Sequence, residues 1–321
     1  MNLPDFIIIG AAKSGTTTLF KYLSNNPVFF VTTPKEPEFF ARDEIYNNGI
    51  EWYSNLFSGA KDSQISCEAS TLYSLYPLFD KTAERMHAAV PGAKLVYVMR
   101  NPVKRAYSYY IQLIKNYQNS SGKDNYTKTF EEFLFDNSDE VGKKNSAHLA
   151  SFDNHLPYGP DLLLSGGLYV NQINEYLKYY DRKSLYLMVF EDFILDPVKE
   201  LNKLYDFLEI DINNKDSEFT EARENISKEH FHEKATQSLI RKFQSIPLVG
   251  KIAKLLPGSM KEETKKILSW FTSFSGAGVK AAPNKMKDET NRYLIKYYRK
   301  PTEQLSELMG RDMVSFWSLD K

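Results

Sequence analysis

Short apolar runs alternate with longer segments of helical periodicity along most of this chain. Apolar residues dominate 6–9, 28–31, 95–99 and 185–190, and 64–68 has the pattern of a further short strand. Such short runs are typical of strands that are buried on both faces of a parallel sheet. The alternation predicts an α/β fold in three layers, with a central parallel sheet flanked by helices.

Helices are predicted between these strands from the spacing of apolar residues and from boundary residues. The expected ranges are about 16–25, 77–90, 102–117 and 197–208. Pro91 and Gly92 form a stop signal for the second helix, and Pro102 opens the third, where a proline is tolerated in the first turn. The segment 288–310 is interpreted as two helices broken at Pro301.

Two segments interrupt the alternation of strands and helices. Residues 119–164 are rich in Asn, Ser, Asp and Lys, which predicts an irregular insertion. Residues 233–284 show two amphipathic stretches separated by Pro257 and Gly258, which predicts a helical insertion. We interpret it as a packed helical subdomain, with a lid over the acceptor or a peripheral contact with membrane lipid as alternatives. The whole chain, 1–321, is expected to form a single domain.

Composition excludes several classes of protein. The 321 residues carry equal numbers of basic and acidic side chains, so a nucleic-acid partner is not indicated. Cys67 is the single cysteine, which rules out an intrachain disulfide, and no cysteine–histidine spacing suggests a metal site. Residues 1–5 lead directly into the first strand, and no run of about eighteen apolar residues exists. These features predict a cytoplasmic protein without a transmembrane segment.

The first strand continues into a glycine-bounded loop and then a helix, an arrangement that holds anions at the helix N-terminus. Gly10 and Gly15 are spaced as in the nucleotide-triphosphate loop G-x-x-x-x-G-K-[ST]. Thr16 stands at the position of the lysine in that motif, and Lys13 lies inside the loop instead. The loop therefore predicts a phosphate-bearing cofactor other than ATP, although a plain strand-to-helix turn can also contain glycine.

A second candidate phosphate site follows the strand at 95–99. Arg100 ends this strand, at the sheet edge where α/β proteins bind ligands, and an arginine can hold a phosphate with two hydrogen bonds. Ser108 lies in the helix that follows and can add a hydroxyl donor. An ATP-dependent P-loop enzyme often has a magnesium-binding aspartate at such a strand end, so Arg100 argues against a kinase or NTPase.

These two segments resemble the cofactor motifs of sulfotransferases that use 3'-phosphoadenosine 5'-phosphosulfate (PAPS). The first matches the family pattern G-x-x-K-[ST]-G-T-[ST], and the second matches R-[ND]-P-x-x-R-x-x-S. The resemblance implies a P-loop-like fold, PAPS as the sulfonyl donor, its bisphosphate PAP as product, and no metal. It assigns the 5'-phosphosulfate to the first segment and the 3'-phosphate to the second. The cofactor residues implied are Gly10, Lys13, Ser14, Gly15, Thr16, Thr17, Arg100 and Ser108.

The segment 33–40 resembles the K-E-x-x-F-F motif of heparan sulfate N- and 3-O-sulfotransferases and related bacterial enzymes. The resemblance implies that Glu36 is the general base and that Lys13 stabilises charge on the leaving phosphate. It places Lys35 and Glu38 on the acceptor side. Many relatives have histidine where this chain has Glu38, and aspartate where it has Ala41, so the acceptor-side chemistry departs from the family pattern.

The likeness covers most of the chain outside 119–164 and 233–284. In heparan-type relatives a basic loop before the last helices touches the 3'-phosphate, and that role is carried over to Lys280 and Lys285 together. Because the chain shows no membrane anchor, the resemblance suggests a bacterial enzyme or an isolated catalytic domain. Its oligomeric state is left open.

The predicted activity is transfer of a sulfonyl group from PAPS to a hydroxyl or amine, with a carbohydrate such as a polysaccharide or glycolipid as the preferred acceptor. A lipid, steroid or other small alcohol is the alternative acceptor. A P-loop kinase or NTPase and a catalytically inactive binding module are more distant alternatives. His148 and His155 remain candidates for the base, because cytosolic sulfotransferases of small molecules use a histidine.

Overall fold

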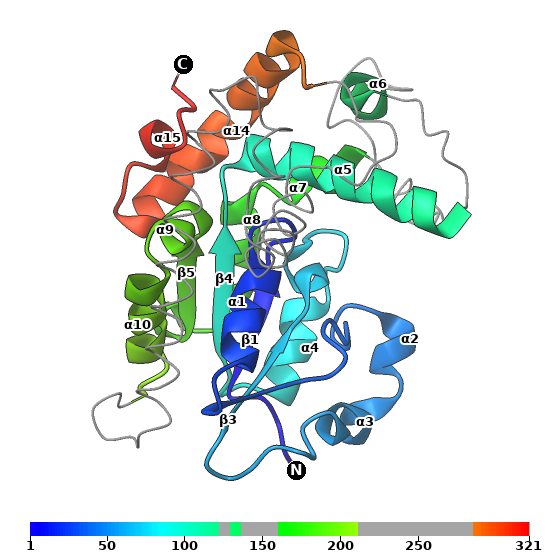
Figure 1. Ribbon diagram of the computed structural model, residues 1–321, viewed down its shortest axis with the longest axis vertical. Helices are drawn as coiled ribbons and strands as arrows, with labels where there is room; N and C mark the ends of the chain where they lie inside the picture. Colours follow the sequence, from blue (N-terminus) through cyan, green and yellow to red (C-terminus); the bar gives the residue numbers. More distant parts are fainter. Residues whose placement is uncertain (122–128, 136–159, 211–284, 321) are drawn as a thin grey trace, which may run out of the picture.

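The structure, a computed structural model, describes residues 1–121, 129–135, 160–210 and 285–320 (Figure 1). Five parallel strands form one sheet in the order β2-β3-β1-β4-β5, as the alternation of strands and helices predicts. The strands are β1 (Phe6–Gly10), β2 (Phe29–Val31), β3 (Ile65–Ala69), β4 (Lys94–Met99) and β5 (Leu185–Val189).

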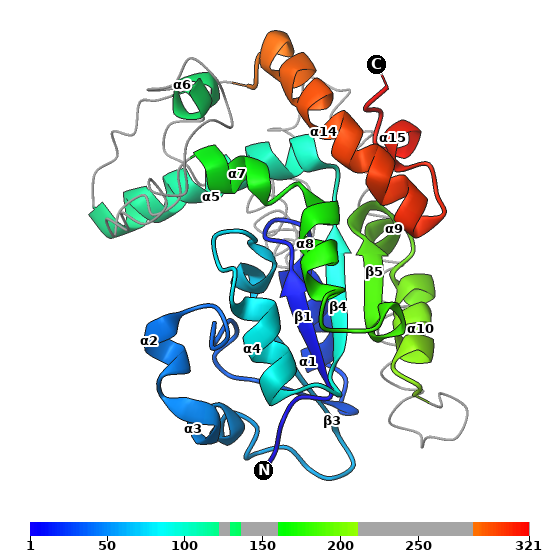
Figure 2. The same cartoon turned by 180° about the vertical axis from the view of Figure 1, so that it is seen from behind.

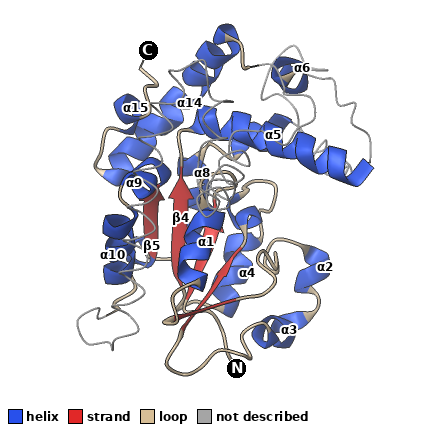
Figure 3. Ribbon diagram, viewed as in Figure 1, coloured by secondary structure: helices blue, strands red, loops and turns tan. Residues whose placement is uncertain are grey.

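Helices cover both faces of this sheet, which gives the predicted three layers. Helix α1 (Thr16–Ser24) lies on one face with α9 (Phe190–Leu195) and α10 (Pro197–Phe207), as Figure 1 shows. Figure 2 shows α4 (Thr82–Ala89) and α8 (Tyr169–Tyr176) in front of the opposite face. The other helices among the described residues are α2 (Asp43–Tyr46), α3 (Gly49–Asn55), α5 (Pro102–Ser121), α6 (Phe130–Phe135), α7 (Pro160–Ser165), α14 (Asp288–Met309) and α15 (Met313–Phe316). Two short 3-10 turns are η1 (Thr71–Ser74) and η3 (Arg182–Ser184). Figure 3 distinguishes helices, strands and loops by colour.

Alternate residues of each strand enter two separate cores. Phe6 and Ile8 of β1 pack with α1, α9 and α10, whereas Ile7 and Ile9 pack in the core that contains α4 and α8. Successive side chains of a strand point to opposite faces, so a sheet covered on both sides needs apolar residues at every position. This packing explains the unbroken apolar runs, and Cys67 in β3 is fully buried among them.

Helix α14 corrects the prediction of two helices broken at Pro301. It runs without interruption over Asp288–Met309, with Pro301 inside it. A proline removes one helical hydrogen bond, which usually ends or bends a helix. Here tertiary packing outweighs that cost, because one face of the helix is buried against α5 and α8. The buried residues are Thr290, Leu294, Tyr298, Thr302 and Leu305.

Other boundaries also differ from the predictions. Helix α4 begins at Thr82 instead of Pro77, because 77–81 forms turns. The stretch expected to be irregular contains the end of α5 and the two short helices α6 and α7 in its described parts. The predicted insertion at 233–284 lies outside the described residues.

The order of the strands creates a switch point beside β1. The chain passes from β1 to β2 and β3 on one side, and then crosses to β4 and β5 on the other. Because the strands are parallel, all their carboxyl ends meet at one edge of the sheet. In open α/β sheets, ligands bind outside this edge at the switch point.

Candidate active site

The loop after β1 passes close to the neighbouring strand ends. Gly10 and Gly15 have φ angles of 146° and 91°, in the region that favours glycine. A Cβ atom on Gly15 would lie 2.5 Å from the ring of Phe190, which follows β5. The glycines predicted from the motif are therefore required by both backbone conformation and close packing.

The hydroxyl residues of the loop motif lie at the start of α1. Gly15 occupies the N-cap position, where it offers no side chain to satisfy the first amides of the helix. Thr16 is buried and Thr17 is exposed. Ser14 is fully buried, and its hydroxyl makes no hydrogen bond of ordinary geometry among the described residues. Open amides and a buried hydroxyl suit a phosphate or sulfate oxygen.

Lys13 and Arg100 come together at the ends of the adjacent strands β1 and β4. The Arg100 guanidinium donates a hydrogen bond of 3.1 Å to the carbonyl oxygen of Lys13. The Lys13 ammonium donates to the Gln112 side chain of α5 at 3.1 Å. The Arg100 guanidinium is thus bonded directly to the backbone of the loop that carries Lys13.

Arg100 is held by residues from distant parts of the chain. Its amide donates to the Tyr169 hydroxyl at 3.2 Å, and this hydroxyl donates to the Arg100 carbonyl at 2.6 Å. The guanidinium lies 4.9 Å from the centre of the Phe190 ring. Burial lowers the pKa of Arg100, although Glu191 opposes this effect. A cation that has lost part of its hydration is suited to binding an anion.

Ser108 and Arg105 lie on the following helix, α5. Ser108 is half-buried in its second turn. Arg105 is fully buried, and one of its terminal nitrogens donates to the Leu163 carbonyl. Its two other nitrogens make no hydrogen bond of ordinary geometry among the described residues, and the guanidinium interacts with the Tyr298 hydroxyl. A Cβ atom on Gly166 would lie 2.8 Å from this guanidinium, so the glycine makes room for the buried charge.

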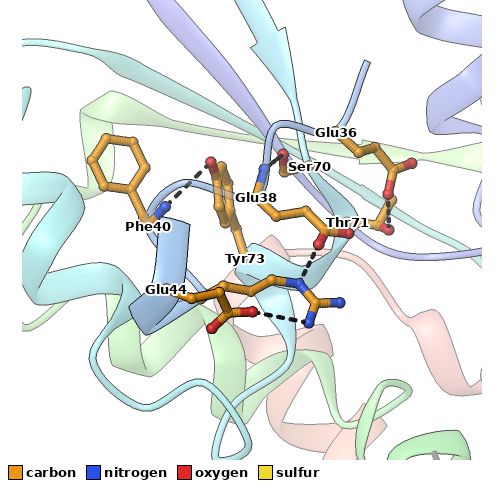
Figure 4. Close-up of polar contacts among 8 residues, drawn as sticks. Glu36, Glu38, Phe40, Glu44, Ser70, Thr71 and Tyr73 are labelled. Carbon is orange, nitrogen blue, oxygen red and sulfur yellow. Dashed lines mark hydrogen bonds and ion pairs between the residues drawn. The ribbon is translucent and has the colours of Figure 1, made fainter. Parts of the chain in front are cut away.

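Glu36 is fixed at the end of β3 (Figure 4). Its amide donates to the Ala69 carbonyl at 3.0 Å, and its carboxylate accepts a hydrogen bond of 3.0 Å from the Thr71 hydroxyl. The other carboxylate oxygen pairs with Lys35 at 2.5 Å. Glu36 is half-buried and has a φ angle of 62°, an uncommon conformation for a residue with a side chain.

Glu38, two residues further along this loop, is also held by contacts of its amide and its carboxylate. Its amide donates to the Ser70 hydroxyl at 3.1 Å (Figure 4), and its carboxylate pairs with Arg42. Burial raises the pKa of the Glu38 carboxyl, and Arg42 acts in the opposite direction. The Phe40 amide donates to the Tyr73 hydroxyl at 3.5 Å. The loop 34–40 is therefore anchored to residues 69–73.

Glu68, in β3, is an ionisable residue that belongs to none of the sequence motifs. It is fully buried, and the Tyr53 hydroxyl donates to its carboxyl at 2.7 Å. Burial raises the pKa of this carboxyl to about 7, against hydrogen bonds from Tyr53, Tyr73 and Ser70. A charged residue inside a buried strand was the sequence signal, but the sequence does not show which groups surround it.

The other candidate site residues do not join this cluster in the described part of the chain. Lys285 is exposed just before α14, and Lys280, His148 and His155 lie outside the described residues. Asp192 of α9 pairs with Arg311 from the C-terminal segment, with one contact of 3.2 Å. This cation lies 119 positions later in the sequence.

Neither a metal centre nor a membrane span occurs in the part of the chain that the structure describes. No three or more His, Cys, Asp or Glu residues gather there in a geometry that would hold a metal ion. None of the described helices is long and apolar enough to cross a membrane.

Comparison with known proteins identifies the family. The sulfotransferase domain profile matches residues 3–252, most of the chain. The chain therefore belongs to the sulfotransferase family, and it is an enzyme of the transferase class. The crystal structure of a sulfotransferase from Alicyclobacillus acidocaldarius aligns with 99% of this chain and 100% of that chain, with a TM-score of 0.61 and 23% identity. The two proteins share the P-loop-like fold.

Curated relatives include enzymes named for heparan sulfate. Human heparan sulfate glucosamine 3-O-sulfotransferase 5 is 30% identical over 212 residues, which are 65% of this chain and 54% of that protein. The bifunctional heparan sulfate N-deacetylase/N-sulfotransferase 1 of Caenorhabditis elegans is 27% identical over 214 residues, 65% of this chain and 22% of the relative. The aligned part thus spans about half of the human relative and about a fifth of the nematode one.

Proposed function

We propose that this enzyme transfers a sulfonyl group from PAPS to a hydroxyl or amine of a carbohydrate acceptor. The proposal rests mainly on the hydrogen bond from the Arg100 guanidinium to the Lys13 carbonyl oxygen, which connects the end of β4 with the loop after β1. It joins two anion-binding elements at the switch point of the sheet. A donor with phosphates at both ends fits this arrangement.

The residues present fit the two ends of such a donor. The first amides of α1 and the buried Ser14 hydroxyl would hold the 5'-phosphosulfate, together with Thr16 and Thr17. Arg100 and Ser108 would hold the 3'-phosphate. PAPS would supply the activated sulfonyl group, and no metal has a role in this proposal. Lys280 and Lys285 are retained as candidate contacts of the 3'-phosphate.

Two side chains would act on the transfer itself. Glu36 would accept the proton of the acceptor hydroxyl or amine, since its carboxylate is half-buried and held by defined partners. Lys13 would stabilise negative charge on the leaving phosphate. Lys35 and Glu38 flank Glu36, so we assign them to acceptor binding.

A carbohydrate is the acceptor class that the relatives favour. Both relatives described above are named for heparan sulfate, and they align with about two thirds of this chain. A lipid or steroid alcohol remains the second candidate, and it rests on the apolar sequence of 233–284. Sulfate transfer from labelled PAPS to N-desulfated heparan sulfate and to cholesterol distinguishes these two acceptors.

Calorimetric titration with PAP, compared with ATP and magnesium, tests the cofactor. We expect the protein to bind PAP in preference to magnesium-ATP and the Arg100→Ala variant to lose this binding. Preference for magnesium-ATP would contradict the proposal and favour a P-loop kinase or NTPase. Arg292→Ala, on α14, controls for the loss of one arginine.

Two substitutions test the catalytic assignments. Lys13→Ala should lower kcat by roughly 10²- to 10³-fold, the usual effect of losing one charge-stabilising donor. Glu36→Gln should abolish transfer and preserve PAP affinity, because the amide keeps the shape of the side chain but cannot accept the proton. Lys21→Ala, at the far end of α1, is the control. Full turnover in Lys13→Ala or Glu36→Gln would remove that residue from the mechanism.

A further inference from the structure

We propose that Thr71 is a positioning residue that orients the carboxylate of Glu36 for proton removal from the acceptor. This inference rests on the proposed function, because it assigns a partner to the proposed base. The Thr71 hydroxyl donates to Oε2 of Glu36 at 3.0 Å, as Figure 4 shows. Thr71 begins the η1 turn after β3, so this contact ties Glu36 to the central sheet.

The two partners of the Glu36 carboxylate differ in how firmly they are placed. Lys35, which pairs with Oε1, is the preceding residue of the same loop and moves with it. Thr71 instead follows Ser70, whose amide donates to the Ile8 carbonyl of β1 at 3.1 Å. The register of β1 with β3 also pairs Ile8 with Ala69. Thr71 therefore fixes the position of the Glu36 carboxylate relative to β1, the strand that leads into the cofactor loop.

Other contacts already fix the backbone of the base loop, which leaves Thr71 a specific role at the side chain. The amides of Glu36 and Glu38 donate to the Ala69 carbonyl and the Ser70 hydroxyl, and neither bond needs the Thr71 side chain. Replacing the Thr71 hydroxyl with a methyl group should thus release the carboxylate and leave the loop in place.

A hydroxyl is also suited chemically to a residue that takes up a proton. It donates to the charged carboxylate, and after rotation it can accept from the protonated acid. The ammonium of Lys35 can only donate. Thr71 thus supplies a neutral partner that serves Glu36 both before and after proton transfer.

Kinetics of Thr71→Val, Thr71→Ser and Thr32→Val test this inference, with labelled PAPS and N-desulfated heparan sulfate as substrates. Thr71→Val should lower kcat by about 10- to 100-fold, the effect of losing a hydrogen bond to a charged group. KM for PAPS, PAP affinity and melting temperature should stay unchanged. Thr71→Ser should recover most of the rate. Thr32→Val is a matched control, because its buried hydroxyl has no hydrogen-bond partner among the described residues.

Several outcomes would overturn the inference. A normal kcat in Thr71→Val, or equal losses in the Val and Ser variants, would show that the hydroxyl does not position the base. Parallel loss of melting temperature and PAP affinity would show a structural role instead. Glu36→Gln separates the two hypotheses: full activity in this variant removes the base assignment, whereas an inactive Glu36→Gln with a normal Thr71→Val removes only the role of Thr71.

A spectroscopic measurement makes the test independent of the acceptor. The side-chain carboxyl ¹³C resonance of Glu36 can be assigned from its disappearance in Glu36→Gln. We expect this resonance to move in Thr71→Val and to keep its position in Thr71→Ser and Thr32→Val. A resonance that does not move in Thr71→Val would contradict the hydrogen bond, and with it the proposal.

Discussion

Glu68 shows how a single buried residue can make stability depend on pH. Burial raises the pKa of its carboxyl from the ordinary 4.5 to about 7 in the folded protein. Between these two values the folded state binds more protons than the unfolded state. The free energy of unfolding therefore falls as pH rises from about 4.5 to about 7, and the lost stability is not regained at higher pH.

The Glu68→Gln variant should lack this loss of stability. Its amide resembles the protonated acid and can still accept from Tyr53. We expect the variant to be more stable than the wild type at pH 8 by on the order of 3 kcal/mol, and similar to it near pH 4.5. Urea unfolding at both pH values measures the difference. Glu84→Gln, at an exposed position of α4, is the control; parallel profiles for Glu68→Gln and wild type would contradict the argument.

Helices α10 and α1 differ in how the free amide groups at their N-termini find hydrogen-bond partners. Helix α10 begins with Pro197, and the side chain of Asp196 accepts a hydrogen bond of 3.2 Å from the Lys199 amide. Helix α1 begins after Gly15, which has no side chain to cap it. The Asp196 side chain stabilises α10, whereas the first amides of α1 are left free to bind a ligand.

Asp196→Ala should therefore lower the free energy of unfolding by about 1 kcal/mol, the usual effect of losing an N-cap. Asp196→Asn should retain most of the stability, because its amide oxygen can still accept from the Lys199 amide. Asp206→Ala, at an exposed position of the same helix, controls for removal of one carboxylate. Chemical unfolding of the three variants compares them; equal values for Asp196→Ala and Asp196→Asn would argue against capping.

The C-terminal segment of the chain packs against the carboxyl edge of the sheet, beside Arg100. The Asn101 side chain donates to the Trp317 carbonyl at 2.8 Å, and the Trp317 indole donates to Glu191 at 3.1 Å. Arg311 pairs with Asp192 on the same helix, α9. The ends of β4 and β5 are thus held together by residues that lie more than a hundred positions later.

Trp317→Phe should weaken this connection. The variant leaves Glu191 without the indole donor, which should lower the free energy of unfolding by about 1–3 kcal/mol. PAP affinity should also fall, because Glu191 accepts a hydrogen bond of 3.0 Å from the amide of Asn101, which directly follows Arg100. Calorimetric unfolding and PAP titration measure the two effects. Trp52→Phe replaces a partly exposed tryptophan and is the control; the same result for both variants would contradict a specific role for Trp317.

Features that depend on neighbouring residues could be predicted from the sequence. The apolar runs predicted the parallel sheet, because strands covered on both faces need apolar side chains at every position. The spacing of Gly10 and Gly15 predicted the loop after β1, and both residues have positive φ angles in the structure. Arg100 follows β4 at the predicted edge of the sheet. These features are local, so short segments of sequence carry them.

Which distant groups meet depends on tertiary packing. It placed Thr71 against Glu36, Arg311 against Asp192 and the hydroxyl of Tyr53 against Glu68. It also kept α14 continuous through Pro301, since burial of one face outweighs a missing hydrogen bond. Contacts between residues far apart in sequence depend on the order of the strands and on packing, and no local pattern records them.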